Sequence, residues 1–135
     1  MLVSFGSSAL ADRADDVRTQ ISHIATSLTA GNVTDAMVPF DKSYGNYDQL
    51  KNDFLGLTSF QIENEIDVTD EQDTDTGANL TVTWMITLTD RSTNQTEHRT
   101  ADLEVRLVLK NRKWKIVGFT PIDIFSPLQK QTPKR

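Results

Sequence analysis

Few side chains in this chain of 135 residues are suited to acid–base, nucleophilic or metal chemistry. It has no cysteine, which excludes disulfides, thiolate metal sites, iron–sulfur clusters and cysteine nucleophiles. Its two histidines, His23 and His98, lie far apart in the sequence and supply too little for a histidine metal cage. From the motifs alone we therefore predict no catalytic residue, no metal site and no cofactor.

His23 has the stronger claim of the two histidines to a functional role. It stands on a predicted helix beside Ile21 and Ile24, about 100° of rotation away from the apolar stripe of that helix. Such a position usually lies at the surface or at the boundary of the core, and the alternative is a general base beside a pocket. His98 follows Glu97 after a polar turn and is predicted to be exposed.

The acidic run that ends at Gly77 has, in part, the spacing of a calcium loop. Glu71, Asp73 and Asp75 fall at alternate positions, as at the start of an EF-hand loop. The glycine comes one place late, however, and Val82 stands where such a loop needs a bidentate glutamate. We interpret the run as a solvated hairpin turn.

The charge of the chain is acidic overall and unevenly distributed. Lys and Arg number 14 against 19 Asp and Glu, a net charge of −5. We predict no nucleic-acid partner, because the molecule as a whole repels phosphate. Residues 47–76 carry a net charge of −8 and residues 110–135 a net charge of +6. No apolar stretch approaches the roughly 20 residues that cross a bilayer, so we predict no membrane span.

Three helices are predicted in the first half of the chain. Residues 8–30 carry one apolar stripe with steps of three and four, and Gly31 follows where a helix-ending glycine belongs. A short second helix, capped by Thr34, is predicted to end near Phe40. A third helix is predicted over residues 47–57.

Four strands follow, because apolar residues now alternate with polar ones. Joined by short turns, they predict an α+β domain in which three N-terminal helices pack on one face of an antiparallel sheet of about four long strands. The predicted inward positions are Phe60, Ile62, Ile66, Leu80, Val82, Trp84, Ile86, Leu103, Val105, Leu107, Trp114 and Ile116. The other face is rich in threonine and is predicted to be solvated, with Met85, Val117 and Phe119 as its apolar members.

One polar residue, Asn64, interrupts the inward apolar positions between Ile62 and Ile66. A buried amide needs hydrogen-bond partners. Asn64 is therefore expected to bind backbone, to be turned outward by a bulge, or to contact a ligand.

The two ends of the chain fall outside the predicted domain, which spans residues 12–127. Residues 1–11 are a lead-in to the first helix or the remnant of a signal peptide, because they end in an Ala-Leu-Ala cleavage pattern but lack a cationic region. The protein is cytoplasmic in the first case and exported or periplasmic in the second. Residues 128–135 are predicted to form a basic, flexible tail.

Three segments resemble the NTF2-like superfamily, which includes SnoaL-like proteins and ketosteroid isomerases. Residues 28–37 resemble the end of its first helix, a glycine turn and a short second helix. Trp84 resembles a residue of its central strand, and residues 113–118 resemble its closing strand. The resemblance covers about residues 12–127 and implies a cystatin-like cone, in which a curved sheet and the helices enclose a pocket.

The resemblance also implies where a ligand would bind. We expect an apolar pocket that holds a small apolar ligand or is filled by the protein's own side chains. The candidate pocket residues are His23, Tyr44, Tyr47, Asn64, Trp84 and Trp114.

Three functions remain open on these grounds. We favour a non-enzymatic domain, because no Asp, Glu or His stands at an inward strand position. An isomerase, dehydratase or cyclase would need His23, or an acid from the helices such as Asp41 or Asp53, to reach the pocket. Since members of the superfamily are often dimers, the third function is an interaction module, and we predict a homodimer through the outer sheet face.

Overall fold

The computed structural model describes residues 2–127, with side chains described from Asp15 onward. The predicted basic tail, residues 128–135, lies outside this part of the chain. In chain order the elements are α1 (Leu2–Thr29), α2 (Val33–Ala36), α3 (Tyr47–Leu57), β1 (Phe60–Asp73), β2 (Gly77–Asp90), β3 (Thr96–Lys110), β4 (Lys113–Thr120) and a 3₁₀ turn, η1 (Asp123–Phe125).

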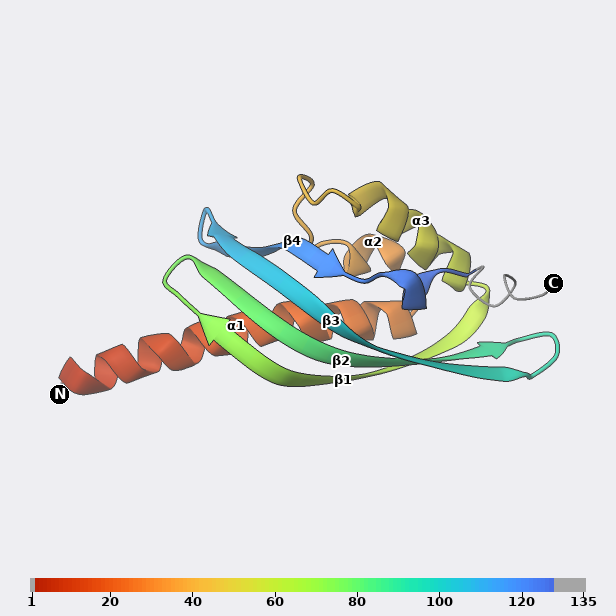
Figure 1. Ribbon diagram of the computed structural model, residues 1–135, viewed down its shortest axis with the longest axis horizontal. Coiled ribbons are helices and arrows are strands. Elements are labelled where there is room, and N and C mark those ends of the chain that lie inside the picture. The colour runs from red at the N-terminus through yellow and green to blue at the C-terminus, as the bar shows by residue number, and fades with distance from the viewer. Residues whose placement is uncertain (1, 128–135) are drawn as a thin grey trace.

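The four strands form one antiparallel sheet in the order β1-β2-β3-β4. α1 packs along β1, and α2 packs against α1. Figure 1 shows the long strands curving past α1, with α2 and α3 grouped near β4. The predicted α+β architecture, three helices on a curved antiparallel sheet of four strands, is confirmed.

The apolar stripe of the first helix faces the sheet. Val17, Ile21, Ile24 and Leu28 are each at most 1 % exposed, and their steps of four, three and four residues place them on one side of a helix. The helical chain begins at Leu2, and its first turns extend past the sheet in Figure 1. No helix in the described part of the chain is both long and apolar enough to cross a membrane.

The second helix differs from its prediction at the cap. Asn32 occupies the cap position, and its Oδ1 accepts a hydrogen bond from the backbone N–H of Asp35 at 3.0 Å. Thr34 therefore lies inside the helix. Gly31, with φ of 75°, turns the chain so that Asn32 rather than Thr34 meets the first free N–H groups.

A β-bulge in β1 reverses the side on which its last residues lie. The register shifts at Thr69, which is the inserted residue. Glu71 then lies opposite Leu80 and turns toward α1, where its Oε1 accepts a hydrogen bond from Arg18 Nε at 2.6 Å. Because β1 continues to Asp73, the acidic run that was predicted as a turn is largely strand.

A second bulge explains why the predicted orientation of Phe119 is wrong. Ile116 and Gly118 of β4 lie opposite adjacent residues of β3, so Val117 between them is an inserted residue. Simple alternation predicts that Phe119 faces outward. The insertion instead places it opposite Val105 on the inner face, where it is fully buried.

The outer face of the sheet is a row of threonines flanked by carboxylates. Thr81 and Thr83 donate hydrogen bonds to carboxylates of β3, at 3.2 Å and 2.7 Å. Three more carboxylates flank the row on β1, those of Glu63, Glu65 and Asp67. Met85, which is 37 % exposed, is the large apolar side chain of this face. The prediction of a solvated, threonine-rich face is confirmed.

Alanine substitution of Phe119 tests its inward orientation. Since the ring is fully buried, Phe119→Ala is expected to lower the free energy of unfolding by about 3–5 kcal/mol. Met85→Ala on the outer face is the control and should change it by less than about 0.5 kcal/mol. Urea denaturation followed by circular dichroism measures both. Equally small effects would mean that Phe119 faces solvent.

Candidate functional site

The inner face of the sheet is packed with aromatic rings. We define the aromatic cluster as Phe40, Phe54, Trp84, Phe119 and Phe125, each at most 3 % exposed. The ring centroid of Phe125 lies 5.3 Å from that of Phe54, 5.4 Å from that of Trp84 and 5.8 Å from that of Phe119. Ring pairs in such edge-to-face and stacked arrangements attract one another beyond the gain from burial. The protein's own side chains thus fill the predicted pocket in this conformation.

Asn64 and Trp84, two of the predicted pocket residues, are joined by a hydrogen bond. Trp84 Nε1 donates to Asn64 Oδ1 at 2.9 Å. Asn64 Nδ2 in turn donates to the backbone oxygen of Ala25 and to Thr29 Oγ1, both at 3.1 Å. Of the three roles predicted for Asn64, the structure shows the hydrogen bond to backbone. This bond joins the sheet to α1.

Tyr44 lies at the border of the aromatic cluster. Its hydroxyl donates to the backbone oxygen of Phe119 at 2.5 Å, and its ring stacks on Phe40 with centroids 5.6 Å apart. Burial raises the pKa of the Tyr44 hydroxyl, and a hydrogen bond with Asn46 offsets only part of this rise. These contacts fix the segment between α2 and α3 over β4.

The other three predicted site residues lie elsewhere. His23 is exposed on α1, with its Nε2 atom 3.0 Å from the backbone oxygen of Asp35. Tyr47, at the start of α3, is half-buried and lines a surface hollow. Trp114 on β4 is a core residue, 5 % exposed, that borders a second surface hollow. The predicted set is therefore divided between the interior and the surface.

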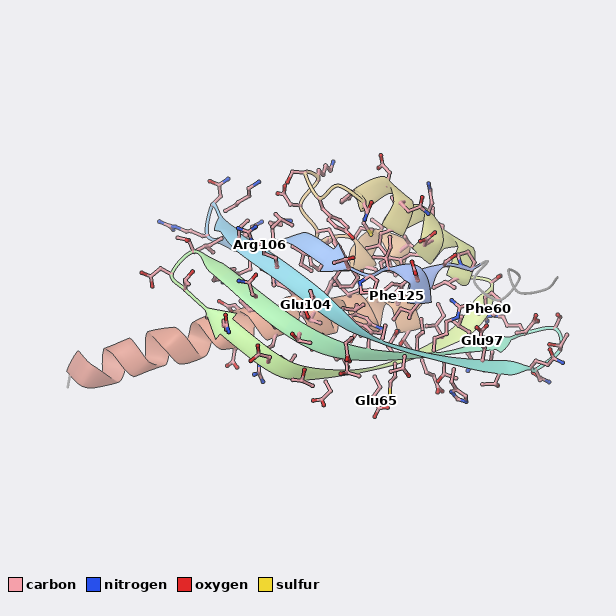
Figure 2. The ribbon with its side chains drawn as sticks, in the orientation of Figure 1. Phe60, Glu65, Glu97, Glu104, Arg106 and Phe125 are labelled. Carbon is pink, nitrogen blue, oxygen red and sulfur yellow. The ribbon has the colours of Figure 1, made fainter. Side chains whose placement is uncertain are left out.

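Phe125 belongs to a segment that closes one side of the interior. We call residues 121–127 the closing segment. Arg99, which is 8 % exposed, donates from Nη1 to the backbone oxygens of Ile124 and Ser126, at 2.8 Å and 2.7 Å. Glu97 accepts from Arg99 Nε at 2.8 Å and so orients the guanidinium group. Figure 2 shows Phe125 beside β3, between the sheet and α3.

The closing segment also meets α3 closely. A Cβ atom added to Gly56 would lie 2.6 Å from Pro127 Cγ, so only glycine leaves room there. Asp53 on the same helix is 8 % exposed, and Gln49 Nε2 donates to its Oδ1 at 2.9 Å. Burial raises the pKa of the Asp53 carboxyl, as does the negative charge of Asp123 in the closing segment.

Three adjoining hollows line the outer surface along β4. Lys115 lines all three, and Lys113, Val38 and Asp41 each line two. We call their combined surface the basic groove. The hollow beside Tyr47 has a volume of about 580 Å³, and the hollow beside Trp114 about 390 Å³.

Asp41 is the carboxylate that the basic groove holds in place. Hydrogen bonds from the side chain and backbone of Ser43, and then from Lys110 Nζ at 3.1 Å, lower the pKa of Asp41 to about 2. Lys110 is thereby paired, and Lys115 Nζ donates to the backbone oxygen of Val38 at 2.9 Å. Asp41 thus holds the start of the loop before α3 against the β3–β4 hairpin.

Sequence reasoning did not assign Phe119, Phe125 and Arg99 to the interior. For Phe125 the available signal was the apolar set of residues 122, 124 and 125 just before the predicted tail. Arg99 continues the inward alternation of Leu103 and Ala101. Residue type does not reveal its burial, because besides Glu97 its partners are backbone oxygens about 25 residues later in the chain.

Solved structures provide the comparison for this arrangement, since the sequence matches no family model and no curated protein. A conserved protein from Planctomyces limnophilus superposes with a TM-score of 0.73 at 11% identity, covering 82% of this chain and 94% of that one. A candidate scytalone dehydratase from Novosphingobium aromaticivorans gives 0.73 at 10% identity, covering 84% and 85%. An NTF2-like protein of unknown function from Shewanella oneidensis gives 0.64 at 9% identity, covering 79% and 96%.

Sequence identities this low support a shared fold but not a shared function. The order of three helices and a four-stranded antiparallel meander, the curved sheet and the position of the helices agree with these structures over most of both chains. The chain therefore has the NTF2-like α+β fold that its sequence resembles.

Proposed function

We propose that this protein is a non-enzymatic binding domain for a small apolar ligand with a ring, which takes the place of the Phe125 ring inside the cone. The observation that carries the proposal is the position of Phe125, which is surrounded by Phe54, Trp84 and Phe119. An aromatic ring of the protein itself occupies the place where a ligand ring would be bound.

The free energies involved make an exchange of rings feasible. Exposing one buried phenylalanine costs about 1.5–3 kcal/mol, whereas a micromolar ligand gains about 8 kcal/mol on binding. A ligand ring of similar size would also restore the contacts with Trp84 that Phe125 gives up. The closing segment is a short 3₁₀ turn near the end of the described chain, so it can move without unfolding the sheet.

The enzymatic alternative has less support. Its proposed groups lie away from the aromatic cluster, with His23 exposed on α1 and Asp41 at the basic groove. Asp53 is buried, but it faces Gln49 and the closing segment. The neighbour that bears a dehydratase name shares only the fold with this chain.

The homodimer through the outer face stays a proposal with reduced support. Phe119, one of the three apolar residues expected on that face, is buried inside, which leaves Met85 and Val117. The carboxylates that flank the threonine row would repel a second copy of the same surface unless cations faced them.

Removing the Phe125 ring should create room for a ligand ring. Phe125→Ala is expected to bind indole at least about tenfold more tightly than the unaltered protein, since binding no longer displaces Phe125 at a cost of about 1.5–3 kcal/mol. Isothermal titration calorimetry measures this. Leu28→Ala, which also empties a fully buried site, is the control and should bind indole no more tightly than the unaltered protein. If Phe125→Ala does not fold, Phe125→Leu takes its place in the binding measurement. Equal binding by the control, or none by folded Phe125 variants, would refute the proposal.

Weakening the contacts that hold the closing segment should also raise the affinity for indole, without removing any aromatic side chain. Hydrogen bonds from a charged donor contribute about 1.5–3 kcal/mol, so Arg99→Gln is expected to raise the population of the open state. Indole affinity should then rise about tenfold. Arg91→Gln is the matched control, because Arg91 also donates to a backbone oxygen, that of Phe60, but does not hold the closing segment. An unchanged affinity in Arg99→Gln would contradict the gating role.

The stability of the protein should fall as the pH rises through the pKa of Asp53. Because burial raises the pKa of Asp53 above 3.8 in the folded state, the folded protein keeps this proton when the unfolded chain has lost it. Stability is therefore lost as the pH rises from 3.8 through the higher folded value. Asp53→Asn should melt at a higher temperature than the unaltered protein at pH 7, with a smaller difference at pH 3. Glu65→Gln, on the exposed outer face, should show no such trend.

A further inference from the structure

The free edge of β4 is covered over only part of its length by the loop that follows α2. Phe40 pairs in parallel with Ile116. The backbone N–H of Ile116 donates to the oxygen of Pro39 at 2.8 Å, and that of Asp41 donates to the oxygen of Ile116 at 2.9 Å. The loop thus forms one bridge of an added strand.

The added strand cannot continue to Trp114. This residue lies two positions before Ile116, so its backbone groups point to the same edge of the sheet. In parallel pairing the next hydrogen bond to the oxygen of Trp114 would come from the N–H of Pro39, and proline has none. The oxygen of Met37, which would accept from the Trp114 N–H, already accepts from the N–H of Phe40 at 3.0 Å.

A hollow adjoins this open stretch of the edge. Its lining includes Val38 and two residues of α1, Asp16 and Gln20, together with four residues of the β3–β4 turn and β4, which are Arg112, Lys113, Trp114 and Lys115. Val38 is 53 % exposed. Trp114 itself is 5 % exposed. The hollow therefore brings an edge residue of β4, an apolar side chain and cationic side chains to one slot.

The charges around the slot favour an acidic occupant. In the part of the chain that the structure describes, Arg112 and Lys113 form no ion pair. Lys110 is already paired with Asp41. The one carboxylate in the lining of this hollow is that of Asp16, so the cations are in excess.

The β3–β4 turn keeps a cationic side chain at a strained position. Asn111 and Arg112 have φ values of 51° and 69°, as in the two-residue hairpin turns that favour Asn-Gly. Arg112 occupies a position whose positive φ glycine would adopt without strain.

We propose that the open edge of β4 at Trp114 binds an extended acidic segment of a partner protein, which adds a short strand beside β4. Backbone hydrogen bonds to Trp114 supply the geometry, as in other cases of strand addition. Acidic side chains of the segment meet Arg112 and Lys113, and an apolar side chain meets Val38. The proposal concerns a different surface from the interior ligand site and does not depend on it.

Binding of designed peptides to the full chain tests the proposal. The probe is a short, capped peptide of alternating glutamate and valine, carrying a fluorophore and followed by anisotropy. It should bind, and the peptide with lysine for glutamate should not. A version with proline for valine keeps the charge but loses backbone donors, and it should bind at least tenfold more weakly. Equal binding of the proline version would refute strand addition.

Variants and competitors complete the test. Arg112→Gly and Lys113→Glu together should weaken the probe at least tenfold, while Lys51→Glu on the exposed side of α3 leaves it unchanged. Since Arg112→Gly relieves a positive φ, it should not unfold the protein. The backbone amide of Trp114 should shift in a nuclear magnetic resonance titration. No binding, or equal displacement by inorganic phosphate or by vesicles of anionic lipid, would overturn the proposal.

Discussion

The indole N–H of Trp84 has to find a hydrogen-bond acceptor inside the protein, because the ring is fully buried. Asn64 supplies that acceptor at 2.9 Å, and its own amide donates to two oxygens of α1. This chain of hydrogen bonds sets the spacing between β1, β2 and the first helix. With the indole held there, the rings of Phe119 and Phe125 pack edge-on against it, so the interior depends on one satisfied polar contact.

The same packing determines how the fold can be used. Here the closing segment covers one side of the inner face of the sheet, with Phe125 against Trp84 and Phe119. Arg99 holds that segment by its backbone oxygens, so closure depends on geometry rather than on the identity of the side chains at residues 124 and 126. Burial, and after it the negative charge of Asp123 in the closing segment, raises the pKa of the Asp53 carboxyl.

Charge is divided between neighbouring surfaces of one sheet. At one end of the sheet the β1–β2 turn, which follows the acidic end of β1, is hydrogen-bonded to β3, through the N–H of Leu109 and the oxygen of Thr76 at 2.9 Å. The cationic β3–β4 hairpin is therefore close to the acidic end of β1, and the net charge of −5 describes neither surface. Exposed pairs between them contribute only about 0–1 kcal/mol each. Their larger effect is on which partners each surface attracts.

The sequence by itself determined the helices, the strands and most of the core, because the spacing of apolar residues reports which side of an element is buried. It also placed Trp84 in the interior and Asn64 at an inward position, with the role of Asn64 left open. The bulge at Val117 could not be read from alternation, since an inserted residue reverses every later position, and Phe119 was assigned to the wrong face for this reason. Tertiary structure alone brought Arg99 to the closing segment and Trp114 to an open edge. Each position depends on backbone groups distant in the chain, and the positions of backbone groups cannot be predicted from residue types.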